Sequence, residues 1–265
     1  MKTLTELLHL PPLFKGFKFV SDTYDQGRPG YPTQVNDWLR KDLQIKKDTV
    51  VLELGAGTGK FTERLLDIGA QVIAVDPEES MREKFHARWP DVMVMEGRAE
   101  GILLPRESVG AVVCAQSFHL FASKESVTEI HRVLKTNGHF GMIWNVRDAG
   151  VDWVHGLADI VNRYAGDHPR YFSGEWRKVL EENFGGKFAP LMETHWRHGH
   201  TGSPEDVIIK RIKSISFIAA MPKEGRDKVM EEVRALIASH AELKDQQTIT
   251  VPYDTVAVHT VKILP

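Results

Sequence analysis

Strand-like and helix-like runs alternate through residues 49–147, and this alternation restricts the chain to a small set of folds. Most of the short apolar runs typical of buried parallel strands are followed by a stretch whose apolar residues recur at helical spacing. Consecutive parallel strands need a long crossover connection, which a helix normally supplies. We therefore expect an α/β protein with a doubly wound parallel sheet.

Glycine, proline and asparagine mark the ends of the predicted elements. The predicted strands of this region are Val50–Leu54, Gln71–Val75, Val92–Glu96, Val109–Ala115 and His139–Asn145. The predicted helices are Thr33–Asp42, Lys60–Ile68, Ser80–Trp89 and Lys124–Leu134, with a turn at Asn137-Gly138.

The region after residue 148 has a less regular pattern, which predicts a helical lid inserted late in the sheet. Helices are expected at Trp153–Tyr164, Gly174–Asn183, Ser203–Ile218 and Lys223–His240. A strand is expected at Met192–Arg197, and two strand-like pieces flank Pro252-Tyr253-Asp254 within Thr248–Ile263. The basic run Lys210-Arg211-Ile212-Lys213 is interpreted as a solvated helix face, with a clamp for an anionic ligand as the alternative.

A glycine-rich segment, Glu53-Leu54-Gly55-Ala56-Gly57-Thr58-Gly59, joins the first predicted strand to the first crossover helix. Glycine permits positive φ and lets a ligand touch the backbone, while the helix start presents free N–H groups. A dinucleotide fingerprint would place its third glycine where Lys60 stands, and a P-loop would have a hydroxyl where Phe61 stands. Glu53 would repel a pyrophosphate and attract an amine. Asp76, which ends the second strand, can accept hydrogen bonds from ribose hydroxyls.

Further motifs follow in a fixed order along the chain. They are Glu96-Gly97-Arg98-Ala99-Glu100 with Leu104-Pro105, then Ala115-Gln116-Ser117-Phe118-His119, then the run from Glu129 to Gly138. With the glycine segment and Asp76, this ordered set resembles the class I S-adenosylmethionine-dependent methyltransferases. Arg98 departs from that pattern, because many relatives carry an acidic or small polar residue there. The resemblance implies a Rossmann-like methyltransferase fold: a doubly wound, mostly parallel seven-stranded sheet with helices on both faces. It also implies S-adenosyl-L-methionine as the cofactor.

Two other segments, Tyr24–Pro32 and Ile215–Pro222, look like a subgroup that includes trans-aconitate methyltransferase-like enzymes. This narrower resemblance implies transfer of a methyl group to a small-molecule acceptor: a carboxylate, a hydroxyl or an amine. It also implies three regions, with residues 1–48 covering the cofactor site and residues 49–147 forming the cofactor-binding core. Residues 148–265 then supply the helical lid and the strands that complete the sheet.

The resemblance also assigns residue roles. The glycines bend around the methionine part of the cofactor with Glu53 near its amino group, Asp76 holds the ribose, and Arg28 can pair with the cofactor carboxylate. The full set of expected cofactor-binding residues is Tyr24, Arg28, Glu53, Gly55, Ala56, Gly57, Thr58, Gly59, Asp76, Pro77, Met81, Ala99, Glu100, Gln116 and Ser117. Trp144, Asn145 and Trp153 are expected to line the acceptor pocket, with a core position as the alternative for Trp144.

Methyl transfer from a sulfonium requires mainly alignment and exclusion of water. A carboxylate acceptor needs no base, whereas a phenol or a protonated amine does. His119, which follows the fourth predicted strand, is the candidate general base, because an ordinary histidine titrates near neutrality. The alternative is a histidine that only packs or hydrogen-bonds to shape the site.

Composition excludes several classes of protein. The chain of 265 residues has 34 Lys plus Arg against 36 Asp plus Glu, a balance that argues against binding nucleic acid through bulk electrostatics. Cys114 is the sole cysteine, so a multi-thiolate zinc site is excluded, and His195, His198 and His200 are expected to pack rather than bind metal. The sequence shows no signal peptide or membrane span, which predicts a cytoplasmic protein, a monomer or a homodimer.

Three other functions remain open. A NAD-dependent oxidoreductase would share the sheet and the ribose-binding acid, although the glycine spacing and Glu53 argue against it. A non-catalytic regulatory protein could keep the cofactor site. A nucleic-acid or protein methyltransferase is the third, although no Asn-Pro-Pro-Tyr-like motif follows the fourth strand.

Overall fold

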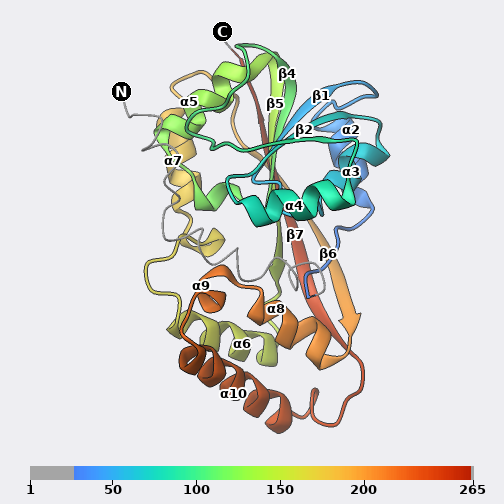
Figure 1. Ribbon diagram of the computed structural model, residues 1–265, viewed down its shortest axis with the longest axis vertical. Coiled ribbons are helices and arrows are strands. Elements are labelled where there is room, and N and C mark those ends of the chain that lie inside the picture. Colours follow the sequence, from blue (N-terminus) through green and yellow to red (C-terminus); the bar gives the residue numbers. More distant parts are fainter. Residues whose placement is uncertain (1–26, 264–265) are drawn as a thin grey trace.

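A seven-stranded sheet forms the centre of the molecule in the computed structural model, which describes residues 27–263 (Figure 1). Its strand order is β3-β2-β1-β4-β5-β7-β6, and β7 runs antiparallel to both of its neighbours. The strands are β1 (Val50–Leu54), β2 (Gln71–Val75), β3 (Met93–Met95), β4 (Val109–Ala115), β5 (Leu134–Arg147), β6 (Met192–Gly202) and β7 (Ile249–Val261). The prediction of a mostly parallel seven-stranded sheet is confirmed.

Helices cover both faces of the parallel strands (Figure 1). One face packs against α5 (Lys124–Val133) and α7 (Glu175–Asn183), and the other packs against α2 (Gln34–Lys41) and α3 (Thr62–Asp67). Helix α4 (Glu79–Arg88) places Phe85 against Ala74 of β2. Helices α2, α5 and α7 are amphipathic, so each buries one apolar stripe on the sheet.

Four further helices form a separate layer, here called the helical insertion, around the outer parts of β6 and β7 (Figure 1). It consists of α6 (Asp152–Arg163), α8 (Lys210–Lys213), α9 (Ser216–Ala219) and α10 (Lys223–Ser239). The π-helix η4 (Glu205–Ile209) lies directly before α8 in the chain. The apolar cluster of the insertion includes Val251 and Tyr253 of β7, so one strand contributes to both layers. The function of this insertion as a lid stays a prediction. Within the described residues, no helix is both long enough and apolar enough to cross a membrane.

Two elements differ from the sequence-based prediction. The two pieces expected around Pro252 are one continuous strand, β7. The ladder between β5 and β7 begins at the pair Arg147 and Tyr253, so Pro252 lies beyond it and its missing N–H interrupts nothing there. The helix expected over Ser203–Ile218 is instead divided into η4, α8 and α9. The break falls at Ser214, whose buried hydroxyl donates to Arg211 O over 2.8 Å and competes with regular helix bonding.

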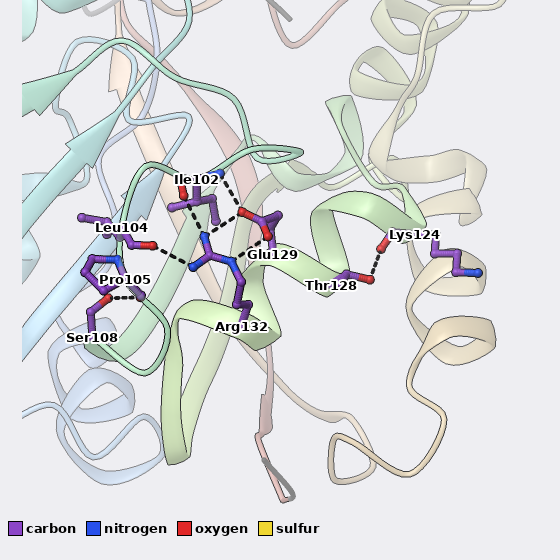
Figure 2. Close-up of polar contacts among 8 residues, drawn as sticks. All are labelled: Ile102, Leu104, Pro105, Ser108, Lys124, Thr128, Glu129 and Arg132. Atoms are coloured by element: carbon purple, nitrogen blue, oxygen red, sulfur yellow. Dashed lines mark hydrogen bonds and ion pairs between the residues drawn. The ribbon is translucent and has the colours of Figure 1, made fainter. Parts of the chain in front are cut away.

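A partly buried polar network connects the loop after β3 to helix α5, as Figure 2 shows. The guanidinium of Arg132 forms two bonds with the Glu129 carboxylate, at 2.7 and 2.8 Å, and donates to the carbonyls of Ile102 and Leu104. Glu129 in turn accepts from Ile102 N over 2.9 Å. The loop that contains Arg98, Ala99 and Glu100 is therefore fixed by side chains rather than by a strand.

Candidate functional site

The first cavity lies at the carboxyl ends of β1, β2 and β4, where ligands bind in open α/β sheets. Nine predicted cofactor-binding residues line it: Gly55, Gly57, Asp76, Pro77, Met81, Ala99, Glu100, Gln116 and Ser117. Leu54, Val75, Leu120 and Phe121 add an apolar wall suited to a flat ring.

The glycine segment owes its shape to three residues with positive φ, Gly55 at 69°, Gly57 at 58° and Gly59 at 75°. A Cβ on Gly55 would lie 2.6 Å from Ser117 Cβ, and one on Gly59 would lie 2.6 Å from Trp89 Cδ1. No atom lies within 4 Å of a Cβ built on Gly57, so this residue faces open space. The absence of a side chain at Gly55 and Gly59 thus allows close packing of Ser117 and Trp89, while at Gly57 it leaves room for a ligand.

Asp76 supports the glycine segment directly. Its Oδ2 accepts from Gly57 N over 2.8 Å and its Oδ1 accepts from Glu78 N over 2.9 Å. Burial raises the pKa of Asp76 to about 6, although both backbone bonds favour the charged form. Each oxygen keeps a further lone pair, so the carboxylate can also accept from a ligand hydroxyl.

A second cavity of about 520 Å³ adjoins the first and shares Gly55, Gly57, Ala115 and Gln116 with it. Its other lining residues come from the segment before α2, from β1, the glycine segment and the residues before α3, and from β5, α8 and β7. They are Arg28, Pro29, Tyr31, Glu53, Ala56, Thr58, Lys60, Phe61, Asn145, Arg211 and Tyr253. Two ligands placed in these cavities would therefore meet beside the glycine segment and Gln116.

Glu53 lines the second cavity and is only 1% exposed. Its Oε2 accepts from Thr62 Oγ1 over 2.6 Å, whereas Oε1 is buried without a hydrogen-bond partner among the described residues. Burial raises the pKa of Glu53 to about 8. A buried carboxyl with one unpaired oxygen fits a cationic amine, because ionisation beside an ammonium group would offset the cost of burial.

Gln116 and Ser117 follow β4 and shape the junction of the two cavities. Gln116 has a φ of 58°, and its amide Nε2 donates to Asn145 O over 3.4 Å. Ser117 donates to Leu54 O over 2.7 Å and so connects the end of β4 to the end of β1. Asn145 itself donates to Gly30 O over 3.0 Å and accepts from Thr255 Oγ1 over 2.6 Å.

His119 and Trp144 line neither cavity. Trp144 is 1% exposed and its ring lies 4.6 Å from that of Trp176, so its expected position in the acceptor pocket is wrong and its alternative, a core position, holds. The indole N–H of Trp144 donates to His119 Nδ1 over 3.1 Å. Burial, together with the charges of Arg28 and Arg170, lowers the pKa of His119 to about 3.

The remaining predicted site residues line neither cavity or lie outside the described residues. Trp153 is buried in the helical insertion and donates to Glu242 over 3.2 Å, so it does not line the acceptor pocket. Gly59 packs on Trp89 rather than lining a cavity. Tyr24 lies outside the described residues. Among the residues that the structure describes, no three His, Cys, Asp or Glu side chains are grouped to hold a metal ion, and His195 instead pairs with Asp254 over 2.6 Å.

Comparisons with known proteins agree with this geometry. The family described as a methyltransferase domain matches residues 52–142, from β1 into β5. A methyltransferase-like protein of Schizosaccharomyces pombe is 34% identical over 249 residues, which cover 94% of this chain and 96% of the relative. A methyltransferase of Mycobacterium tuberculosis is 35% identical over 235 residues, covering 89% and 90%. The chain belongs to the S-adenosylmethionine-dependent methyltransferases. Its cofactor is therefore S-adenosylmethionine, and the relatives give no support to an oxidoreductase.

Solved structures show that this methyltransferase also has the fold of its family. YcgJ protein from Bacillus subtilis superposes with a TM-score of 0.58 and 20% identity, covering 88% of this chain and all of that one. Phosphoethanolamine N-methyltransferase 2 of Haemonchus contortus, solved with S-adenosyl-L-methionine, gives a TM-score of 0.55 and 14% identity, covering 94% of this chain and 57% of that one. Both are Rossmann-like methyltransferase folds, as the sequence predicts.

Several polar residues that line the second cavity were not predicted from the sequence of this methyltransferase. Tyr31 and Lys60 lie within or beside the motifs of the N-terminal half, whereas Arg211 and Tyr253 come from distant segments that no such motif marks. The basic run around Arg211 was the available signal for that residue, and the structure places Arg211 beside the cavity, while its role as an anion clamp stays a prediction. Alternation within β7 would also have been informative, because Tyr253 is buried between two half-buried residues.

Proposed function

We propose that this methyltransferase transfers the cofactor methyl group to a small-molecule acceptor bound in the second cavity. The observation that carries the proposal is the shared wall of the two cavities, formed by Gly55, Gly57, Ala115 and Gln116. A nucleoside bound in the first cavity would direct its reactive end toward this wall. A recess lined by side chains from several elements suits a metabolite rather than a folded protein or a nucleic acid.

The residues of the site divide into two proposed roles. Asp76 would hold the ribose hydroxyls, Met81 and Ala99 would contact the adenine, and Gly57 would let the backbone approach the methionine part. Glu53 would receive the amino group at its unpaired Oε1. When bound, the cofactor supplies a methyl group already activated by its sulfonium charge, so the protein has mainly to orient the acceptor and exclude water.

The segment before α2 and the helical insertion would close the acceptor cavity. The guanidinium of Arg28 donates to Ser214 O over 3.1 Å, while Lys60 Nζ donates to the carbonyl of Arg28. A Cβ on Gly27 would lie 2.4 Å from Arg211 N, so only glycine allows this close packing on α8. We infer that these contacts give the insertion the function of a lid.

A labelled-methyl assay tests the proposal. The purified protein is incubated with S-adenosylmethionine carrying a tritiated methyl group and a small-molecule cell extract, with Asp76→Asn as the matched variant. Transfer of label to a low-molecular-weight product, strongly reduced in the variant, is expected. Transfer to added protein or RNA instead of the extract would contradict a small-molecule acceptor.

A further inference from the structure

Positive charge is concentrated at the second cavity. Arg28, Lys60 and Arg211 all line it, and they come from three segments far apart in the sequence. Glu53 is the sole carboxyl residue in that lining, and its raised pKa, about 8, keeps it largely uncharged at neutral pH unless an amine binds beside it. The cavity therefore presents a cationic surface.

Besides Oε1 of Glu53, the buried polar atoms of this lining that have no hydrogen-bond partner among residues 27–263 include two donors. They are Nη1 of Arg211 and the hydroxyl of Tyr253, a side chain that is 2% exposed. Buried polar groups are rarely left unsatisfied in folded proteins, and an unsatisfied one commonly marks a missing ligand or water. Two such donors that line one cavity indicate an acceptor-rich ligand.

A second arginine supports the same conclusion. Arg147 lies directly opposite Tyr253 in the ladder between β5 and β7. Burial and the nearby charges of Arg211 and Arg170 lower the pKa of Arg147 to about 10. No side chain in the described part of the chain forms a hydrogen bond or ion pair with the Arg147 guanidinium, whereas the guanidinium of Arg132 is fully engaged by Glu129 and two carbonyls.

S-adenosylmethionine does not balance these charges. At neutral pH it carries one carboxylate, one ammonium group and one sulfonium, so its net charge is positive. Its single carboxylate can pair with Arg28, whereas neither Arg211 nor Arg147 forms an ion pair with a carboxylate among the described residues. An uncompensated buried charge is costly, which favours a second ligand with negative charge.

We propose that the methyl acceptor is a small anion, and that Arg211 and Tyr253 bind its carboxylate or phosphate group with Arg147 beside them. This inference rests on the proposed function, because it names the class of molecule that the second cavity takes. An arginine fork with an adjacent phenol O–H matches the oxygens of either anion. Arg211 would thus be a specificity-determining residue that the helical insertion brings to the site.

Fractionated extract gives the first test. A small-molecule extract is separated on an anion exchanger into a bound and an unbound fraction, and each is incubated with enzyme and labelled cofactor. Label is expected in products from the bound fraction, with a rate at least about tenfold lower for Arg211→Gln and for Tyr253→Phe. Tyr253→Phe removes only a hydroxyl, so it preserves packing, and Arg234→Gln is the control because Arg234 pairs with exposed Glu205 on the surface. Label solely from the unbound fraction would overturn the inference while leaving methyl transfer intact.

A binding measurement separates failure of the inference from failure of the proposed function. Protein loaded with S-adenosylhomocysteine is titrated with succinate or inorganic phosphate at constant ionic strength, and its melting temperature is recorded. Saturable stabilisation by one of these anions, absent with uncharged succinamide and lost in Arg211→Gln, is expected. No saturable effect of either anion would overturn the inference. A loss of S-adenosylhomocysteine affinity in Arg211→Gln would do the same, because it would assign the guanidinium to the cofactor. Failure of the wild type to bind S-adenosylhomocysteine would instead contradict the proposed function.

Discussion

Trp144 donates its indole N–H to Nδ1 of His119 over 3.1 Å, and this bond fixes the tautomer of the imidazole. With Nδ1 accepting, the proton of the neutral ring is on Nε2. The pKa of His119, lowered to about 3 by burial and by nearby arginines, keeps the ring neutral at physiological pH. His119 therefore presents a donor rather than a base, which supports the structural alternative to the predicted catalytic role.

The pH dependence of turnover checks this view of His119. Between about pH 5.5 and 8.5, we expect no limb in kcat that depends on His119, because the folded ring does not titrate there, so wild type and His119→Asn should give pH profiles of the same shape. His119→Asn should lower kcat by about three- to tenfold, the usual value of one hydrogen bond. An acidic limb near pH 6.5 that disappears in His119→Asn would restore the general base.

Gly57 and Gly59 should respond differently to the same substitution. Both have positive φ, so alanine strains the backbone by about 1–2 kcal/mol at either position. The new methyl group meets Trp89 at residue 59 but enters open space at residue 57. We expect Gly57→Ala to lose most S-adenosylhomocysteine affinity with a modest fall in melting temperature, and Gly59→Ala to unfold more readily. Calorimetric titration and thermal melts measure both, and equal effects on binding would contradict the assignment.

Asp76→Asn is expected to weaken S-adenosylhomocysteine binding at least about tenfold. The two carboxylate oxygens hold Gly57 N and Glu78 N, and an amide offers a single acceptor oxygen. Each lost charge-assisted bond is worth about 1.5–3 kcal/mol. Asp67→Asn is the matched control, because Asp67 pairs with Arg64 at the surface of α3. Unchanged affinity in Asp76→Asn would remove Asp76 from the cofactor site.

Glu53 predicts an unusual dependence of stability on pH. Its folded pKa, about 8, lies above the ordinary value of 4.5, so the folded protein holds this proton more tightly than the unfolded chain does. Its contribution to stability is therefore complete below about pH 4.5 and is lost as the pH rises through 8. Glu53→Gln, which never ionises, should gain melting temperature relative to wild type between pH 5 and pH 8 in the absence of ligand.

Glu63→Gln, at an exposed carboxylate of α3, is the control for that experiment. Glu53→Gln should also weaken S-adenosylhomocysteine binding, because a neutral amide cannot neutralise the amino group. A melting-temperature difference between Glu53→Gln and wild type that does not change with pH would contradict the raised pKa.

Arg132→Gln should disturb the cofactor site from a distance. The substitution leaves the Glu129 carboxylate without its guanidinium and removes the donors to the carbonyls of Ile102 and Leu104 (Figure 2). We expect a loss of about 1–3 kcal/mol in unfolding free energy and weaker S-adenosylhomocysteine binding, because the loop with Ala99 loses its anchor. Arg163→Gln, in the helical insertion, removes a surface pair with Glu232 and should affect neither property strongly.

The parallel half of the fold was predictable because its signals are local. β1, β2 and β4 match the predicted bounds, since each is a short apolar run that ends at a turn residue. Asn137-Gly138, predicted as a turn, lies within the bounds of β5, but Asn137 has a φ of 62° and the pairing with β4 jumps from Leu134 to His139. Continuous pairing with β4 and β7 begins at His139, where the predicted strand also begins.

The two cavities differ in how far the sequence predicts them. Residues of the first, such as Asp76 and Gly57, belong to compact motifs, so each could be assigned before the structure was described. Arg211 and Tyr253 reach the second only through a broken helix and an antiparallel strand from the end of the chain. Trp144 and Trp153 were misplaced because aromatic residues near a site also build its core.

β7 comes last in the sequence yet lies between β5 and β6 in the sheet. During synthesis, β6 and the outer edge of β5 both lack a partner strand until β7, which ends at residue 261, has left the ribosome. Two exposed strand edges on a nascent chain invite pairing with other chains, so this interval is the aggregation-prone stage of biogenesis. Tyr253 also lies in β7. The lining of the second cavity is therefore complete only when β7 has joined the sheet.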